Sequence, residues 1–124
     1  MPTSTVVQHR WSDIAPEQIN ADVSRQYITA DRVTIARFEL KRGGVVPRHA
    51  HENEQVSIVL SGAVLFRIDG REITVRGGEV MQIPGNVAHE VEVLEDALVV
   101  DVFSPIRQDW IDKTDHYFAR TPRT

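Results

Sequence analysis

The sequence predicts an all-β protein, and two observations support this fold class. Dipeptides typical of tight turns recur through the second half of the chain, with roughly eight residues between them. The segments between the turns are rich in Val, Ile and Phe, which strands favour. The turn dipeptides are Ser61-Gly62, Asp69-Gly70, Gly77-Gly78, Gly85-Asn86 and Glu95-Asp96. Short strands at such regular spacing are typical of a β-sandwich or a β-barrel.

The expected strands follow one another from residue 32 onward. The first lies in the run RVTIARFEL, which stops at the glycines Gly43 and Gly44. The later strands are expected in VSIVL, AVLFRI, EITV, EVMQI and ALVVDVF. Between two of these segments, Asp69-Gly70 is a strong signal for a hairpin turn.

The two ends of the chain are less regular. Residues 15–26 are polar and predict a loop or a short helix. Near the other end, apolar residues follow the spacing i, i+1, i+4, i+7 and i+8, which predicts a short amphipathic helix covering part of the sheet. The residues with this spacing are Trp110, Ile111, Thr114, Tyr117 and Phe118.

Composition limits the classes of function. A chain of 124 residues with 41% hydrophobic content suits one compact domain. The net charge of −4 argues against nucleic acid as a partner, whereas the bias of Lys+Arg toward Arg suits planar anions such as carboxylates. Because Cys is absent, any metal must be held by nitrogen and oxygen. Without a signal-like N-terminus or an apolar run of about 20 residues, we expect a cytoplasmic protein with no membrane partner.

The stretch HAHENEQVSIVLSG, residues 49–62, contains the first candidate site. Alternate residues of a strand point to the same side, so His49 and His51 can direct their imidazoles at a common point. Such a pair is a candidate metal clamp. Histidine pairs also occur on solvated strand faces, so the spacing alone leaves both interpretations open.

The residues around this pair form two spaced motifs. The first is a glycine, His-x-His, a polar residue and a glycine, at Gly43, His49, His51, Gln55 and Gly62. The second contains Gly78, Pro84 and His89, with Asn86 where a further glycine is expected and Val93 where an asparagine is expected. Asn tolerates positive φ better than other non-glycine residues, so the turn at Asn86 is expected to persist. Together the two motifs resemble those of the cupin superfamily, with Gln55 in place of the usual acid.

This resemblance implies a cupin jelly-roll barrel (double-stranded β-helix) with a short C-terminal helical segment. The whole chain, residues 1–124, would be a single cupin domain with its barrel core at about 33–105. One divalent ion would be bound by His49, His51, Gln55 and His89, and such a ligand set suits Ni, Zn, Fe, Mn or Co better than Mg or Ca. Neutral Gln55 would leave the ion a stronger Lewis acid. Glu54 is the rival fourth ligand, but strand alternation turns it to the opposite face.

A narrower resemblance involves the segments HAHENEQVSIVLSG, PGNVAHEVEVLED and DVFSPIRQDW. They are similar to small single-domain cupins of the pectin-degradation protein KdgF family. This resemblance implies a metal-dependent lyase or isomerase that opens 4,5-unsaturated uronic acid monosaccharides into linear ketones. Asp101, Phe103 and Arg107 match positions that act in catalysis and substrate binding in that family. It also implies a homodimer and a small carboxylate substrate.

The alternation of side chains along a strand singles out Asp101 independently of any family resemblance. Ala97, Val99, Asp101 and Phe103 share one strand face, so Asp101 interrupts an apolar row. A carboxylate there needs a partner or a function. The structural alternative is a salt bridge, for which Arg107 is a candidate partner.

Two other functions fit the same residues. Three histidines can hold iron or copper in a dioxygenase, and a non-catalytic barrel can use a metal to anchor a carboxylate ligand. Outside the two motifs, His9 and His116 lack ligand spacing and are expected at the surface. We expect Trp11 and Trp110 in packing or at a subunit interface, and Arg48 as a solvated charge.

Overall fold

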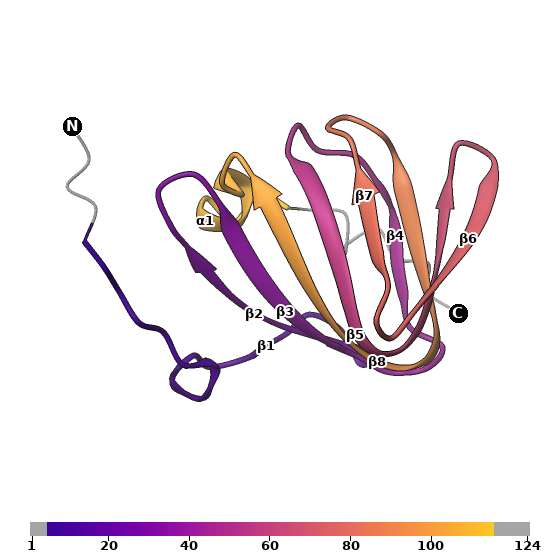
Figure 1. Ribbon diagram of the computed structural model, residues 1–124, viewed down its shortest axis with the longest axis horizontal. Helices are drawn as coiled ribbons and strands as arrows, with labels where there is room; N and C mark the ends of the chain where they lie inside the picture. Colours follow the sequence, from indigo (N-terminus) through magenta and orange to yellow (C-terminus); the bar gives the residue numbers. More distant parts are fainter. Residues whose placement is uncertain (1–4, 116–124) are drawn as a thin grey trace.

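The computed structural model describes residues 5–115, which form one eight-stranded antiparallel sheet with little helix (Figure 1). The sheet is strongly curved, and α1 lies at one end of it. The elements are the 3-10 helix η1 (Trp11–Asp13), β1 (Glu17–Gln18), β2 (Val23–Thr29), β3 (Thr34–Leu40), β4 (Val45–His49), β5 (Glu54–Ile68), β6 (Arg71–Arg76), β7 (Val80–Ile83), β8 (His89–Ser104) and α1 (Gln108–Ile111).

The two longest strands, β5 and β8, each contribute to two layers. The first part of β8 pairs with β4 and with the second part of β5, which also pairs with β6. The second part of β8 pairs with β3 and with the first part of β5, which also pairs with β7. This arrangement confirms the predicted all-β jelly roll, although the sheet does not close into a complete ring.

Two of the predicted turns are wrong, because Ser61-Gly62 and Glu95-Asp96 lie inside continuous strands. The β5–β8 register shifts at three places between Val59 and Val64. Such bulges bend a strand without ending it. Gly62 has φ +82, and a Cβ atom at this position would lie 2.1 Å from the carbonyl oxygen of Asp96. Gly62 therefore permits a close backbone contact at the bend.

The other turn signals agree with the structure. Asp69 and Gly70 have φ values of 53 and 73, as a two-residue hairpin turn of type I′ requires. Asn86 has φ 65, which confirms the expectation that asparagine takes the left-handed conformation here. The turn at Gly85-Asn86 connects β7 to β8 and so places His89 at the start of β8.

The predicted loop or short helix over residues 15–26 is wrong, because this stretch contains β1 and the start of β2. Glu17 and Gln18 are exposed, but the polar residues of β2 in this stretch are not solvated in the same way. Arg25 is buried and pairs with Glu17 and Asp115, while Gln26 is buried and donates to two backbone carbonyls. Polar residues with satisfied partners can occupy inward strand positions.

The C-terminal helix is shorter than its predicted pattern. It ends at Ile111, and Thr114 lies beyond it. Tyr117 and Phe118 are outside the described residues. Trp110 is buried against the core, which is lined by side chains from both layers. Within residues 5–115, no helix is long and apolar enough to span a membrane.

Candidate metal centre

Three histidines converge between the two layers of the sheet. His49 ends β4 and pairs with His89, the first residue of β8, while His51 lies in the segment after β4. The expectation that His49 and His51 share a strand is therefore wrong. Their side chains still converge, because the candidate ligand atoms of His49, His51 and His89 all lie within 4.8 Å of one another.

The backbone fixes the tautomer of each imidazole. Nδ1 of His49 lies 2.7 Å from the Pro47 carbonyl, Nδ1 of His51 3.1 Å from that of Asn53, and Nδ1 of His89 2.9 Å from that of Val87. A carbonyl oxygen only accepts, so each Nδ1 donates and carries the proton. In each neutral ring Nε2 is then the atom with a lone pair, as a metal ligand requires.

The imidazoles are neutral near pH 7. Burial and, to a smaller extent, the nearby His89 lower the pKa of His49 to about 3. Burial also lowers the pKa of His51 to about 4, with the Arg107 charge as the next cause, and lowers that of His89. Protons therefore compete weakly for the three Nε2 atoms at neutral pH.

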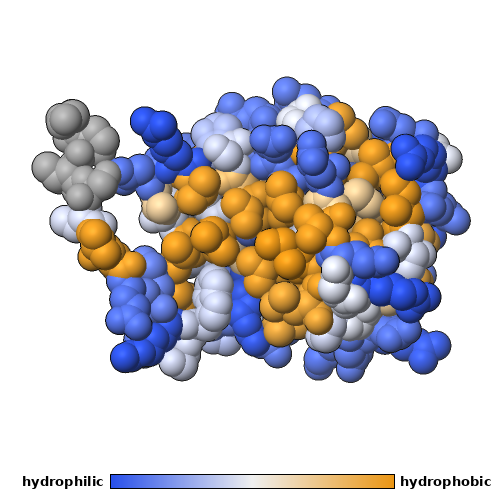
Figure 2. All heavy atoms as spheres, viewed as in Figure 1, coloured by the Kyte–Doolittle hydropathy of each residue, from blue (hydrophilic) through white to orange (hydrophobic). Residues whose placement is uncertain are grey.

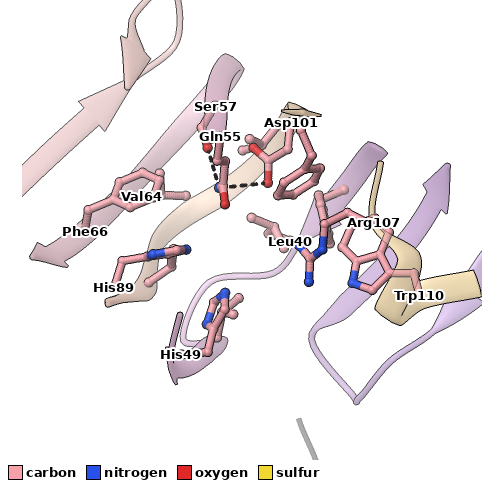
Figure 3. Close-up of a pocket in the computed structure, with 15 residues that line it drawn as sticks. Leu40, His49, Gln55, Ser57, Val64, Phe66, His89, Asp101, Arg107 and Trp110 are labelled. Atoms are coloured by element: carbon pink, nitrogen blue, oxygen red, sulfur yellow. Dashed lines mark hydrogen bonds between the residues drawn. The ribbon is translucent and has the colours of Figure 1, made fainter. Parts of the chain in front are cut away.

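Gln55 supplies a fourth lone-pair donor. Its Nε2 donates to the Ser57 hydroxyl at 2.9 Å and to Oδ2 of Asp101 at 3.3 Å (Figure 3). These two bonds leave Oε1 directed toward His51. Oε1 lies 3.0 Å from Nε2 of His51. Because Nδ1 of His51 carries the proton, this contact joins two acceptors with no hydrogen between them. A cation bound by both atoms would satisfy them.

This donor set fits a divalent first-row ion. Two ligand atoms bound to one ion at about 2.1 Å lie about 3.0–3.4 Å apart, which matches the His51–Gln55 contact. Nε2 of His89 is buried and has no hydrogen-bond partner among residues 5–115. The residues that could hold the ion are thus His49, His51, Gln55 and His89. Glu54 is exposed while Gln55 is buried, so the rival ligand lies on the other face.

A cavity adjoins the histidines. It has an empty volume of about 510 Å³ with its open mouth included. Most of the lining is apolar. The polar residues that line it are His49, Gln55, Ser57, His89, Asp101 and Arg107.

Asp101 points into this cavity from β8 (Figure 3). Burial alternates along strand β8 as expected: residues 97, 99, 101 and 103 are buried, and the residues between them are half-buried. Oδ2 of Asp101 accepts the hydrogen bond from Gln55, but Oδ1 is buried without a partner among residues 5–115. Burial raises the pKa of Asp101 to about 7, while Ser57 and Arg107 act in the opposite direction.

Arg107 lies beside Asp101 but forms its ion pair with another residue. Its Nε and Nη2 donate to the two carboxylate oxygens of Asp109 at 2.9 and 2.8 Å. The guanidinium carbon lies 4.6 Å from the centre of the Phe103 ring, and Arg107 is only 1% exposed. The salt bridge between Asp101 and Arg107 that the sequence left open is not among the ion pairs of residues 5–115, since Arg107 pairs with Asp109. Asp101, Phe103 and Arg107 line one cavity, as expected.

Sequence reasoning missed several residues of the site. Asp109 orients Arg107, and Ser57 contacts Gln55. Asn53 is buried and donates to the carbonyls of Pro105 and Ile106, which ties the His51 segment to the segment that precedes Arg107. Ser57 could have been found from the sequence, because residues 55 and 57 of one strand point to the same side. His9 and Arg48 are exposed, as expected, and His116 lies outside the described residues.

Comparisons with known proteins agree with this geometry. The profile of the cupin domain matches residues 36–103. The pectin degradation protein KdgF of Dickeya dadantii is 26% identical over 98 residues, which cover 77% of this chain and 89% of that protein.

Solved structures give the same result. KdgF from Halomonas sp. superposes with a TM-score of 0.74 at 25% identity, covering 80% of this chain and 94% of the other. An RmlC-like cupin from Shewanella frigidimarina has a TM-score of 0.79 at 23% identity, covering 88% and 99%, and supports the fold alone. Because the domain match spans more than half of the sequence and includes all three histidines of the site, the chain belongs to the cupin family.

Proposed function

We propose that this protein is a metal-dependent enzyme that opens the ring of 4,5-unsaturated uronic acid monosaccharides to give linear ketones. The observation that carries the proposal is the buried Oδ1 of Asp101, which has no partner among residues 5–115 and shares one cavity with His49, His89 and Arg107. Similarity to KdgF proteins from two organisms supports the same activity.

The proposed reaction needs one proton carrier and no co-reactant. In an unsaturated uronate, the ring oxygen of the hemiacetal is also the oxygen of an enol ether. Asp101 accepts the proton of the anomeric hydroxyl as the bond from the anomeric carbon to the ring oxygen breaks. The enolate that forms takes a proton at C4, returned by Asp101, and becomes the ketone. A pKa near 7 suits a group that must both accept and donate a proton.

The other residues bind and orient the substrate. His49, His51, Gln55 and His89 would hold a divalent ion, which supplies Lewis-acid stabilisation of negative charge on a ligand oxygen. Arg107 binds the carboxylate of the uronate, held in place by its contact with Asp109. Phe103 forms an apolar wall between this carboxylate and the His51 ring, whose centre lies 5.6 Å from that of Phe103.

An anaerobic assay tests the proposal. Metal-loaded protein is mixed with the monosaccharide product of a uronate lyase, and ultraviolet absorbance of the C4=C5 bond is followed. We expect the absorbance to disappear without oxygen, with a linear ketone as product. A substrate that is recovered unchanged would refute the proposal and favour a binding role. Conversion of a small organic substrate only with oxygen uptake would favour a dioxygenase.

We also propose that the protein forms a homodimer through the outer face of the sheet. Apolar side chains gather over the middle of the face in Figure 2. The outward residues of β3, β5, β7 and β8 on this face are Ile35, Val56, Ile58, Leu60, Val80, Leu98, Val100 and Val102. Arg37 and Glu39 lie beside them, and a two-fold axis can set Arg37 of one copy against Glu39 of another.

Charge placed on this face is expected to dissociate the dimer. Leu60 and Val80 are 54% and 59% exposed, so Val80→Glu costs the monomer little packing. Sedimentation should show a dimer for the native protein and a monomer for Val80→Glu. The same change at Val6, which is fully exposed on the N-terminal segment, is the matched control. A native protein that sediments as a monomer contradicts this proposal.

A further inference from the structure

Three buried side-chain nitrogen or oxygen atoms have no hydrogen-bond partner among residues 5–115. They are Nε2 of His89, Oδ1 of Asp101 and Nε1 of Trp110, and all three residues line the same cavity. The proposed function uses the first two atoms, as a metal ligand and as a proton carrier. It gives no role to the indole N–H of Trp110.

An unpartnered indole N–H is unusual at this depth. Trp110 is 2% exposed, and a buried tryptophan normally donates its N–H to an acceptor. Trp110 lies in α1, three residues after Arg107, and its backbone N–H donates to the Arg107 carbonyl. In Figure 3 the indole nitrogen lies on the side of the ring that faces the cavity, beside the end of the Arg107 side chain.

The surrounding side chains hold the indole in one orientation. The guanidinium carbons of Arg25 and Arg107 lie 4.2 and 4.3 Å from the centre of the Trp110 ring. Phe103 and Tyr27 pack against it, with ring centres at 5.1 and 5.2 Å. A side chain this restricted cannot rotate to find another acceptor, so its N–H stays directed at the cavity.

The charges near the indole favour an anionic acceptor. Two guanidinium groups withdraw electron density from the ring that they cover, which strengthens its N–H as a donor. Arg107 also lines the cavity, and its positive charge favours an anion there. A carboxylate has two oxygens and can accept from both residues at once.

We propose that Trp110 is a specificity-determining residue that donates its indole N–H to the ligand carboxylate bound by Arg107. This inference rests on the proposed function and deepens it, since it explains how the cavity would select uronates over neutral sugars. The selection follows from pairing. A neutral ligand with an apolar group at this place would leave the indole N–H of Trp110 unpaired.

The test replaces one atom of the side chain. Trp11 and Trp110 are the only tryptophans of the chain. In a Trp11→Phe background, Trp110 is replaced biosynthetically by β-(3-benzothienyl)alanine, in which sulfur takes the place of the N–H. The bicyclic ring and its packing are retained, and thermal unfolding verifies this. Binding of D-galacturonate, a saturated uronate, and of glycolate is measured by calorimetry on the zinc-loaded protein, and the ¹⁵N-labelled indole signal of Trp110 is followed by NMR.

Both ligands are expected to shift the Trp110 indole signal, and the sulfur analogue is expected to weaken D-galacturonate binding by roughly 10-fold to 100-fold. In ring opening, KM should rise by a similar factor with kcat nearly unchanged, because the contact lies away from the reacting bond. Unchanged binding by the sulfur analogue, or an indole signal that neither ligand moves, would overturn the inference.

The outcome separates this inference from the proposed function. If unsaturated uronates are opened but the sulfur analogue binds D-galacturonate normally, the function stands and the role of Trp110 is wrong. If glycolate and D-galacturonate bind through the Trp110 N–H but no uronate is opened, Trp110 recognises carboxylates and the proposed reaction is wrong.

Discussion

Asp101→Asn is expected to lower kcat/KM for ring opening by about 10²-fold to 10⁴-fold, the usual contribution of a positioned acid–base group. Asparagine has nearly the same shape, and its side-chain oxygen can still accept the hydrogen bond that Gln55 donates to Oδ2 of Asp101. It cannot accept or return a proton. Steady-state kinetics, elemental analysis and thermal unfolding should therefore show a folded, metal-loaded and nearly inactive protein.

A matched control separates this effect from a general change of charge. Glu95 lies on the same strand, β8, and its side chain is 62% exposed in a surface pair with Arg76. Surface pairs of this kind contribute little to stability, so Glu95→Gln should keep full activity. If Asp101→Asn retains activity within about threefold of the native protein, well short of the loss expected for an acid–base group, Asp101 is not the proton carrier.

The parts of the site that follow from local spacing were predictable from the sequence. The set His49, His51, Gln55 and His89 came from the resemblance of two spaced motifs to those of the cupin superfamily, and the structure brings these residues together. The inward position of Asp101 follows from the two-residue period of a strand, which depends only on neighbouring positions.

The parts that depend on tertiary contacts were not predictable in the same way. Asp109 is two residues from Arg107, but nothing in the sequence distinguishes it from Asp101 as the ion-pair partner. Trp110 fits an amphipathic pattern that indicates packing, and only the structure shows that its indole N–H lacks an acceptor within residues 5–115. The buried polar residues of β2 were misassigned because their acceptors lie in other segments of the chain.

Gln55 stands where the cupin motif usually has an acid, and the structure gives a physical reason for the amide. Its two ends face different partners. Oε1 lies at the candidate metal centre, 3.0 Å from His51, while Nε2 donates to Ser57 and Asp101. A carboxylate can replace the first end as a metal ligand. It cannot replace the second, because an ionised carboxylate has no hydrogen to donate.

Gln55→Glu is therefore expected to keep the metal and lose activity at neutral pH by about 10-fold to 10³-fold, as a like charge beside a carboxylate raises its pKa by about 1–3 units. Asp101 starts from a pKa of about 7 and acts as a base only when ionised, so a higher pKa leaves less of the base at pH 7. The rise of kcat/KM with pH should move to higher pH, and the loss should diminish in alkaline buffer.

The pH profile distinguishes this explanation from simple damage to the metal centre. Metal loss would lower activity at every pH, and elemental analysis would detect it. Gln8→Glu adds the same charge at an exposed position of the N-terminal segment, away from the proposed dimer face, and should leave the profile unchanged. If Gln55→Glu kept native activity with an unshifted profile, the amide would be only a metal ligand. The hydrogen bond from Gln55 to Asp101 would then have no part in proton transfer.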